Sequence, residues 1–368
     1  MNILHLSNDY SGSTVYKNLC SAEDKLGISQ TIYNARKKTI HSNKNTISFK
    51  NSSSAIIYSN ILNIFTRINF FHKQNKIYND LCSKVTDIQS IDLIHAHTWF
   101  SDGAIAYKLY TEFKIPYIIA IRDTDINMFF KYLLHLRKLG IRILLNAEKI
   151  IFISMAHQQR FVKHKAIKKH LNALSNKIEV IPNGIDNFWI ENAACRKNKL
   201  SSNPQLLFIG IFNKRKNISR LIKAISKLKY EGYDLTLNLV GGEKGKFSKN
   251  DNIKNHGIIS DKNELKKIIN QSDIFTMPSL TETFGLVYIE ALSQGIPVLY
   301  SKNEGIDGMY DNIGESVFPK SVESIKNGIR LLIEDYDKYN FNPKCILSNH
   351  NWDVIAQKYF DIYQTIKS

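Results

Sequence analysis

The chain has 368 residues, of which 43% are hydrophobic and 11% aromatic, so it is long enough for two domains that each bury a core of their own. No apolar run approaches the ~18 uncharged residues of a membrane-spanning helix, and the N-terminus lacks the basic lead of a signal peptide. The four cysteines lie far apart, and no cluster of His, Cys or Asp has the spacing of a metal site. The net charge of +17 suits an anionic partner, but no nucleic-acid recognition motif accompanies it. We expect a cytoplasmic protein that binds neither a metal nor nucleic acid.

Short apolar runs alternate with segments of helical periodicity through the first half of the chain. A helix is predicted through Leu19, Ala22 and Leu26, with Gly27 as its cap. Residues 39–60 are polar and predict a long irregular excursion. Strands are predicted at residues 3–6, 28–33, 92–96, 117–121, 149–153 and 178–181. Six strands that alternate with helices predict one doubly wound parallel sheet, which we place in a domain of residues 1–185.

A second alternation begins after a break. The residues Pro182, Asn183 and Gly184, and the polar stretch that continues to Pro204, predict a linker, which we place at 186–204. The second domain is expected at residues 205–350. Its first strands are predicted at 205–209, 235–240 and 257–259, and helices are predicted at 218–230, 262–270 and, in the C-terminal tail, 352–366.

Residues 279–295, SLTETFGLVYIEALSQG, carry the most specific pattern in the chain. An apolar run with helical spacing ends at Gly295, so Glu282 lies on the loop before a helix and Glu290 about one and a half turns inside it. Gly285 lets the backbone approach a ligand at the helix start, where free N–H groups and the helix dipole favour an anion. Two carboxylates beside an anion site suit a ligand with phosphates and hydroxyls, such as a nucleotide sugar.

The flanking segments decide between this hypothesis and an ordinary surface helix, because a glutamate in the second turn of a helix is common. An apolar strand that ends at Pro278 precedes the segment, and the apolar run Val298, Leu299 and Tyr300 follows it. A strand, a helix and a second strand form one βαβ unit of an open parallel sheet. Because such sheets bind ligands beyond the carboxyl ends of their strands, the sequence predicts a ligand site at residues 279–290.

Together these motifs resemble the retaining GT-B glycosyltransferases, the large family that contains glycogen-synthase-like and mannosyltransferase-type enzymes. The resemblance covers nearly the whole chain and rests on the order and spacing of several motifs. These are the opening loop with Gly12, DLIHAH at 92–97, VIPNGID at 180–186, FIG at 208–210 followed by Lys216, LVG at 239–241, Gly257, and the glutamate segment at 279–301. The family implies an α/β fold of two Rossmann-like doubly wound parallel-sheet domains that face a cleft. It also implies a C-terminal helix, residues 351–368, that packs back on the first domain.

The resemblance implies a role for each matching residue of the second domain, where the family binds most of the donor. Glu290 would bind ribose hydroxyls, Glu282 would be a catalytic residue that contacts the transferred sugar, and Lys216 would neutralise the diphosphate. Without the resemblance, Lys216 would be interpreted as a solvated lysine and Gly12 as an ordinary turn glycine. The implied donor-binding residues are Gly12, Arg215, Lys216, Ile259, Thr283, Phe284, Gly285, Leu286 and Glu290.

Two positions depart from the family pattern. Ile211 stands where the family often has an arginine, and Arg215 would supply the missing positive charge. Arg122 stands where the family often has a histidine near the donor sugar, and we expect it to act there as a second catalytic residue. These departures leave the identity of the donor sugar open.

The first domain carries the candidate acceptor site. His97, Trp99 and Asp102 follow one of its strands and are expected to face the cleft. An aromatic ring beside a carboxylate suits a sugar acceptor, because the ring stacks on C–H faces while the acid binds hydroxyls. Asp123 is expected to add an acceptor contact. A tryptophan packed inside its own loop explains the pattern equally well.

The resemblance implies a metal-independent, retaining hexosyltransferase that needs no cofactor. It would move a sugar from a UDP- or GDP-sugar to a hydroxyl of a growing surface glycan or glycolipid, such as capsule or lipopolysaccharide. No carboxylate is placed as a covalent nucleophile, so we expect front-side attack with a diphosphate oxygen as the base. Two alternatives stay open: an epimerase or phosphorylase of the same fold, and a non-catalytic sugar-nucleotide-binding subunit.

The densest basic segment is residues 160–171, RFVKHKAIKKHL. Phe161, Ile167 and Leu171 could share one helical face with lysines around the rest, which would suit a helix lying on an anionic membrane surface. A solvated surface helix fits the pattern nearly as well. Peripheral association with the inner face of the cell membrane is therefore one of our expectations.

Overall fold

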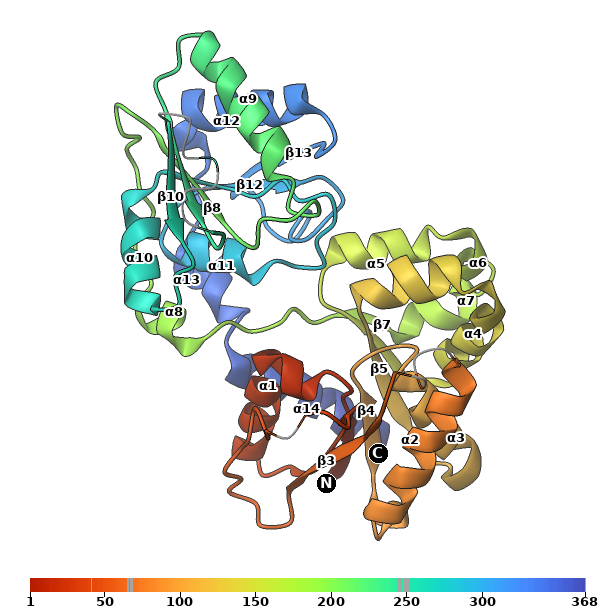
Figure 1. Cartoon of the computed structure of the whole chain (residues 1–368). Helices are drawn as coiled ribbons and strands as arrows, with labels where there is room; N and C mark the ends of the chain where they lie inside the picture. Colours follow the sequence, from red (N-terminus) through yellow and green to blue (C-terminus); the bar gives the residue numbers. More distant parts are fainter. Residues whose placement is uncertain (41, 65, 67–68, 244–246, 248–251, 368) are drawn as a thin grey trace. The chain divides into compact units, whose positions relative to one another are not determined.

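The chain forms two compact units, each built around one parallel sheet (Figure 1). The computed structural model describes residues 1–368 except 41, 65, 67–68, 244–246, 248–251 and 368. The first unit comprises Met1–Ile153, Gln158–Gly184 and Trp352–Ser368, and the second comprises Ser154–His157 and Ile185–Asn351. The two parallel sheets with their helices confirm the predicted fold class.

The first sheet has seven parallel strands in the order β3-β2-β1-β4-β5-β6-β7. Its central strands are buried along almost their whole length, because helices cover both faces of such a sheet and leave neither to water. The strands are β1 (Asn2–Leu6), β2 (Ser29–Lys37), β3 (Ala55–Leu62), β4 (Leu93–Ala96), β5 (Tyr117–Ile121), β6 (Lys149–Phe152) and β7 (Ile178–Val180).

Most of the helices that accompany this sheet lie in the connections between its strands, and one comes from the C-terminal end of the chain. The α-helices are α1 (Thr14–Lys25), α2 (Phe70–Lys84), α3 (Gly103–Phe113), α4 (Arg137–Asn146), α5 (Met155–Val162), α6 (Lys165–Lys168), α7 (Leu171–Leu174) and the C-terminal α14 (Trp352–Lys367). Shorter helical turns are η1 (Tyr10–Gly12), η3 (Ile88–Ser90), the π-helix η4 (Asp125–Phe130), η5 (Leu134–Leu136) and η6 (Ser175–Lys177).

Strand β3 lies partly inside residues 39–60, where we expected only an irregular excursion, so that prediction is wrong for its last part. It pairs in parallel with β2 and forms the edge of the sheet. Only Ser59 of its eight residues is buried. Six of its eight residues, AIIYSNIL, are apolar or aromatic, and the strand was missed because this run directly follows the polar residues 39–54.

The second sheet has six parallel strands in the order β10-β9-β8-β11-β12-β13. The last strand of this sheet and the helix that follows it were not among the elements that we predicted. The strands are β8 (Gln205–Ile209), β9 (Thr236–Val240), β10 (Ile253–Gly257), β11 (Ile274–Thr276), β12 (Val298–Ser301) and β13 (Gly314–Val317). The helices are α8 (Asn187–Glu191), α9 (Ile218–Tyr230), α10 (Lys262–Gln271), α11 (Leu286–Ser293), α12 (Val322–Glu334), η7 (Tyr336–Lys338) and α13 (Pro343–Ser348).

Residues 186–204, where we expected a linker, belong to the second unit and contain α8. This segment passes close to the end of α11, where Ala194 N–H donates to the Ser293 carbonyl at 2.8 Å. Gly295 follows α11 with a φ of 74°, and a Cβ there would lie 2.1 Å from the Cys195 carbonyl oxygen. Glycine is therefore required at this helix end, where the sequence predicted the cap.

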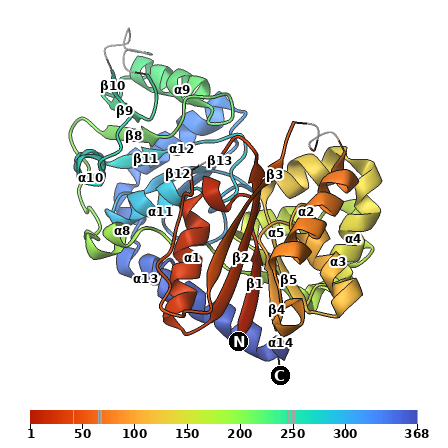
Figure 2. The ribbon, with the colours of Figure 1, turned by 60° about the horizontal axis from the view of Figure 1, so that its bottom comes forward.

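The C-terminal helix α14 packs against α1 within the first unit, and both chain termini lie at this end of the unit (Figure 2). The hydroxyl of Tyr363 donates to Glu23 Oε1 at 2.7 Å and lies 2.7 Å from His95 Nδ1. Glu23 belongs to α1 and His95 to β4. One buried hydroxyl therefore joins the last helix to the first helix and to the centre of the sheet.

Replacing Tyr363 by Phe is expected to loosen α14. The variant keeps the ring but removes a donor from the buried Glu23 carboxylate, at a cost of roughly 1–3 kcal/mol. Hydrogen exchange of the α14 amides measures this as a fall in the free energy of local opening. Tyr359→Phe is the matched control, because its hydroxyl forms no hydrogen bond within the described part of the chain. Equal exchange in the two variants would contradict the role of the Tyr363 hydroxyl.

Candidate functional site

Three loops meet at the carboxyl edge of the second sheet. The strands β8, β11 and β12 are adjacent and parallel, so the loops that follow them begin at the same edge. These loops carry Lys216 after β8, Glu282 after β11 and Glu304 after β12. Gly305 N–H donates to the Glu282 carbonyl at 2.8 Å and thereby ties two of the loops together.

The carboxylate of Glu282 is the centre of this cluster. It accepts a hydrogen bond from Lys216 Nζ at 2.6 Å and lies 3.4 Å from an Nη atom of Arg215. The Glu282 backbone N–H donates to the Glu304 carboxylate at 2.9 Å. The side chains of Lys216 and Glu282 are only 12% and 10% exposed, so water screens this ion pair much less than a surface pair. The structure therefore brings together the predicted residues Glu282, Lys216 and Arg215.

Asn217 fixes the loop that carries Lys216. It is buried and has a left-handed backbone, with a φ of 62°. Its Nδ2 donates to the carbonyls of Pro278 at 2.9 Å and Pro319 at 2.6 Å. Because Asn217 is bound to two neighbouring loops, Lys216 is held towards Glu282. The alternative interpretation of Lys216 as a solvated lysine does not fit this geometry.

The start of α11 offers free backbone donors. Gly285 is the N-cap residue with a φ of 83°, and no side chain caps the helix. A Cβ at this position would lie 2.7 Å from the ring of Tyr288, so glycine is required there. The N–H groups of Gly285, Leu286 and Val287 find no acceptor among the described residues. About four such donors begin a helix; here Tyr288 N–H donates to the Gly285 carbonyl at 3.0 Å, and the three named N–H groups remain available to an anion.

The neighbouring predicted residues Thr283 and Phe284 differ in exposure. Thr283 is partly exposed on the loop before α11. The Phe284 side chain is buried, with its ring 5.3 Å from the ring of His350. Phe284 can therefore face a ligand only through its backbone, which is the role that the resemblance implied.

Glu290 occupies the second turn of α11 and is partly buried. Burial raises the pKa of its carboxyl to about 7, and the nearby Asp186 carboxylate raises this pKa further, while Lys262 opposes the change. Asp186 and Lys262 pair with each other at 2.5 Å. Within the described part of the chain, no hydrogen bond engages the Glu290 carboxylate. This carboxylate is therefore available to a ligand hydroxyl.

Glycines bring the backbones of three neighbouring strand ends close together. Gly241 N–H donates to the Gly257 carbonyl at 2.8 Å, and a Cβ on Gly241 would lie 2.7 Å from the Gly210 carbonyl oxygen. Ile211, directly after Gly210, is 72% exposed, and Ile259 is half-buried on the loop after β10. The position after Gly210 thus presents an apolar side chain, and positive charge comes instead from Arg215 and Lys216.

Trp99 in the first unit is a core residue. Its ring is fully buried against Phe100, and its Nε1–H donates to the Gly140 carbonyl at 2.9 Å. A ring in this position cannot stack on an acceptor sugar. The expectation that Trp99 binds an acceptor is wrong, because the tryptophan packs inside the unit, which was the alternative that the pattern left open.

His97 and Asp102 also serve the interior of the first unit. Asp102 accepts hydrogen bonds from the Thr98 hydroxyl at 2.9 Å and from Asn8 N–H at 3.1 Å, and burial raises its pKa to about 7. His97 Nε2 lies 3.1 Å from His5 Nδ1, and burial holds the pKa of His97 well below its usual range. Both side chains are too buried to meet an acceptor, and we correct their role to holding the loops after β1 and β4.

Three other predicted residues remain partly exposed at the carboxyl edge of the first sheet. Arg122 Nε donates to the His97 carbonyl at 3.1 Å. Asp123 accepts from Asn127 Nδ2 at 2.5 Å, and Gly12 lies in the turn η1 after β1. The catalytic role of Arg122, the acceptor role of Asp123 and the donor role of Gly12 stay predictions.

The basic segment 160–171 is not one amphipathic helix. It is divided among α5, α6 and α7, and its residues Phe161 and Ile167 are buried in the core. Lys163 and Lys165 are exposed. The expectation of a shared membrane-facing apolar side is wrong here, because these apolar side chains already pack inside the unit.

Two features bear on metals and membranes. Among the described helices, none is long and apolar enough to cross a bilayer. In the described residues, two groups of buried side chains of metal-binding types have their ligand atoms within 4.8 Å of one another. One group is His5, His95 and His97, and the other is His5, Cys20 and Glu23. The rings of His95 and His97 are stacked at 4.1 Å. The lone pair of an imidazole nitrogen lies in the plane of its ring. The nitrogen lone pairs of the stacked His95 and His97 rings therefore do not point to one common metal ion.

The sequence did not identify four residues that complete the site. Glu304 and Asn217 hold the loops around Glu282, and Asp186 and Lys262 lie near Glu290. A signal existed for Glu304, because it follows the predicted strand at 298–300 and the carboxyl ends of neighbouring parallel strands share one edge. Asp186 ends the VIPNGID motif of residues 180–186, but nothing in that motif pointed to Glu290, which Asp186 approaches only through the folded path of the chain.

The Glu290 carboxyl is expected to titrate near neutral pH. Carbon NMR of labelled glutamate side chains measures this pKa directly. In Asp186→Asn the pKa should fall, because a neighbouring negative charge is removed, and in Lys262→Gln it should rise, because the opposing cation is lost. A Glu290 pKa that stays unchanged in both variants would contradict the assigned electrostatic coupling.

The comparisons with known proteins agree with this geometry. The family model "Glycosyl transferases group 1" matches residues 191–342, and "Glycosyltransferase Family 4" matches residues 18–187. An uncharacterized glycosyltransferase of Methanocaldococcus jannaschii is 24% identical over 312 residues, which are 76% of this chain and 77% of that protein. An uncharacterized 41.2 kDa protein in the cps region of Klebsiella pneumoniae is 24% identical over 260 residues, 63% of this chain and 68% of that protein.

A solved structure supports the fold. Sucrose-phosphate synthase from Thermosynechococcus elongatus superimposes with a TM-score of 0.72 at 19% sequence identity, covering 100% of this chain and 99% of the other. The two family models meet near the division between the two units. The chain is therefore a glycosyltransferase of the GT-B fold, with a family 4 domain at residues 18–187 and a group 1 domain at residues 191–342.

Proposed function

We propose that this glycosyltransferase moves a sugar from a UDP- or GDP-sugar to a hydroxyl of a growing surface glycan or glycolipid, with retention of configuration and without a metal. The observation that carries the proposal is the cluster of Lys216, Arg215 and Glu282. It adjoins the loop that leads into the uncapped start of α11. Fixed positive charge, free N–H groups and a carboxylate are the groups that complement a sugar diphosphate.

The diphosphate is assigned to Lys216, Arg215 and the start of α11. Negative charge accumulates on the diphosphate as its bond to the sugar breaks, and fixed positive charge at that place stabilises the transition state. The helix N-terminus adds a partial positive charge and free donors. These groups supply the charge stabilisation for which other enzymes use a divalent cation, which supports metal independence.

Glu290 is assigned to the ribose of the donor. Its carboxylate is partly buried, forms no hydrogen bond within the described chain and lies on the same helix as the free donors. An ionised carboxylate accepts hydrogen bonds from two neighbouring hydroxyls, which a ribose presents. The raised pKa implies that this acceptor weakens as the pH falls through about 7.

Glu282 is assigned to the transferred sugar. In the ligand-free protein the Glu282 carboxylate is the ion-pair partner of Lys216. Phosphate oxygens of the donor would therefore have to replace Glu282 as that partner. This exchange frees the Glu282 carboxylate for sugar hydroxyls and for the positive charge that develops at the anomeric carbon. A departing diphosphate oxygen takes the proton of the acceptor hydroxyl, which attacks from the same face and preserves the configuration.

The acceptor class rests on a relative. The protein of the Klebsiella pneumoniae cps region is similar over 63% of this chain, which supports a role in surface polysaccharide synthesis. Such a role places the enzyme where nucleotide sugars are made, on the cytoplasmic side of the membrane. Asp123 and Arg122 remain the exposed candidates for acceptor and sugar contacts in the first unit.

The proposal is tested by incubating the chain with UDP- and GDP-sugars, with and without hydroxyl acceptors. Release of nucleoside diphosphate is followed, and proton NMR determines the anomeric configuration of the product. Retention with turnover that survives EDTA is expected. An inverted product, or activity that EDTA abolishes, would contradict the mechanism. Binding of a nucleotide sugar without any release would identify a non-catalytic binding protein instead.

Lys216→Ala is expected to lower kcat by about 100-fold or more, because the leaving diphosphate loses its buried cation. Lys214→Ala is the matched control two residues away, since Lys214 is exposed and forms no ion pair among the described residues. Its kcat should stay within about twofold of the parent, as is usual for a surface change. Similar losses in both variants would show that general positive charge, and not the placed lysine, supports the reaction.

Glu282→Ala is expected to separate binding from turnover. Free nucleoside diphosphate should bind more tightly than to the parent, because the carboxylate that competes for Lys216 is gone. Turnover should fall steeply, because the sugar loses its carboxylate partner. Isothermal calorimetry and initial rates measure the two effects. Weaker nucleotide binding in this variant would contradict the exchange of partners at Lys216.

A further inference from the structure

A group of large apolar side chains stays exposed on the first unit. We call this group the apolar rim. It consists of Ile64, Phe71, Met128, Tyr132 and Leu134, with exposed fractions of 74%, 53%, 55%, 67% and 60%. The members follow β3 and β5, so they lie in connections that begin at the carboxyl edge of the sheet. Apolar side chains that gather on a surface mark an interaction site, whereas single ones do not.

Aromatic contacts connect the two parts of the apolar rim. Phe70, at the start of α2, packs against Phe129 of η4 with ring centroids 6.1 Å apart. Phe71 is the next residue along the chain from Phe70, and Met128 directly precedes Phe129. The exposed residues therefore sit on neighbouring, packed elements. Phe129 in turn stacks on Phe100 at 5.3 Å, which anchors these elements to the core.

The rim residues are not needed to fill that core. Between η4 and α4, Phe130 and Leu136 point inward and are fully buried. Their neighbours Tyr132 and Leu134 remain outside. The same short segment thus contains both buried and exposed apolar side chains. Packing within this unit does not explain why the exposed positions are apolar.

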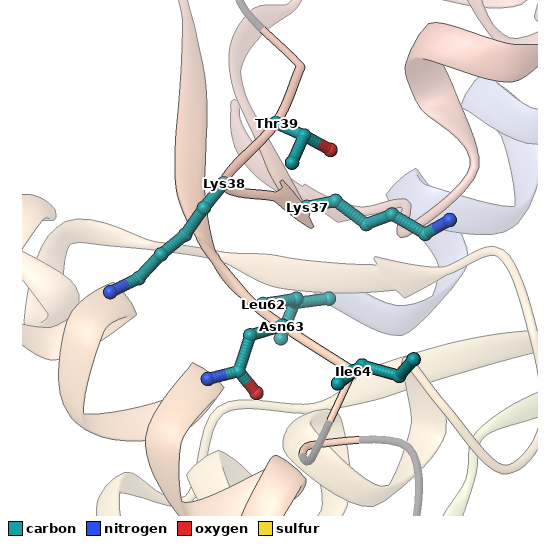
Figure 3. A pocket seen from close by; sticks show the side chains of 6 residues that line it. All are labelled: Lys37, Lys38, Thr39, Leu62, Asn63 and Ile64. Atoms are coloured by element: carbon teal, nitrogen blue, oxygen red, sulfur yellow. The ribbon is translucent and has the colours of Figure 1, made fainter.

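A pocket lies at one end of the rim. It has a volume of about 340 Å³ and is lined by Lys37, Lys38, Thr39, Leu62, Asn63 and Ile64 (Figure 3). The side chains of Lys37 and Lys38 extend in opposite directions from the end of β2, while Leu62 and Ile64 supply apolar surface from the end of β3 (Figure 3). Cationic tips beside an apolar wall suit an amphiphile with an anionic head.

The two stretches of sequence that supply the rim residues are strongly basic. Residues 25–79 contain nine Lys and Arg and no Asp or Glu. Residues 126–178 contain eleven Lys and Arg and one acidic residue, Glu148. A general lysine bias would add cations throughout the chain, but it would not remove acids from these two stretches. The depletion of acids therefore indicates an anionic partner for this part of the first unit.

We propose that the apolar rim and its surrounding lysines dock this protein on an anionic lipid bilayer. Apolar and aromatic side chains enter the boundary between headgroups and acyl chains, and lysines bind the anionic headgroups. Charge complementarity favours this partner over the apolar surface of another protein. The rim differs from the basic segment 160–171, whose Phe161 and Ile167 are buried.

The position of the rim has a consequence for the acceptor, which rests on the proposed function. The connections after β3 and β5 begin at the same sheet edge as the loop after β1, which carries Gly12, and as Arg122 itself. A bilayer held at this edge would present lipid-linked hydroxyls to those residues. The rim therefore favours a membrane-bound glycolipid over a free sugar as the acceptor.

Vesicle cosedimentation with the full chain tests the docking surface. Phosphatidylcholine vesicles are compared with vesicles that also contain phosphatidylglycerol. The parent should bind the anionic vesicles, and high salt should weaken this binding. The triple variant Phe71→Ser, Tyr132→Ser and Leu134→Ser should lower the partition coefficient about tenfold or more, because the inserting side chains are removed. Circular dichroism should show an unchanged fold, since these side chains are exposed.

The matched control changes three exposed apolar residues of the second unit: Tyr230→Ser, Phe318→Ser and Leu331→Ser. Its partition should stay within about twofold of the parent, as expected for surface changes away from the docking face. Equal losses in the two triple variants, or no binding of the parent to anionic vesicles, would overturn the proposal. Self-association that only the rim variant loses would also overturn it and assign the rim to protein contacts.

Calorimetry of nucleoside diphosphate binding on the same samples keeps the two proposals apart. The donor residues belong to the second unit, so the rim variant should bind the nucleotide as the parent does. Loss of vesicle binding by the rim variant, with nucleotide binding intact, would support the proposed docking surface. Vesicle binding by a parent chain that binds no nucleotide would overturn the proposed function and leave the docking surface standing.

Discussion

The shielded ion pair between Lys216 and Glu282 is the interaction on which the proposed donor site depends. Both charges are largely removed from water, and their mutual attraction offsets the free energy of desolvation. Either charge without the other would be strongly destabilising. The loops after β8, β11 and β12 are therefore locked together in the absence of a ligand. In the proposed mechanism, a diphosphate would replace Glu282 as the partner of Lys216, and this exchange would release Glu282 for the sugar.

Much of this site could be predicted because its parts are local in sequence. A strand, a loop, an uncapped helix and a second strand follow one another within residues 272–301, and periodicity alone places Glu282 before the helix and Glu290 inside it. Asp186 could not be found in this way. It influences the pKa of Glu290 from a segment about a hundred residues away, and only the folded path of the chain brings the two together.

The first unit shows where residue type fails as a guide. Trp99, Phe161 and Ile167 were expected at binding surfaces, yet all three are buried. Tyr132 and Leu134, which resemble core residues, are exposed. A hydrophobic side chain is more stable away from water, but the packing of the helices on the sheet decides which hydrophobic side chains become buried. Edge strand β3 escaped prediction because its apolar run directly follows the polar residues 39–54.

The most direct test of the account is a structure of the chain with UDP or GDP bound. We expect the β-phosphate to contact Lys216 Nζ and the start of α11, the ribose to contact Glu290, and the 2.6 Å contact between Lys216 and Glu282 to be broken. A nucleotide bound elsewhere, with the Lys216–Glu282 pair intact, would contradict the central claim that this pair is exchanged when the donor binds.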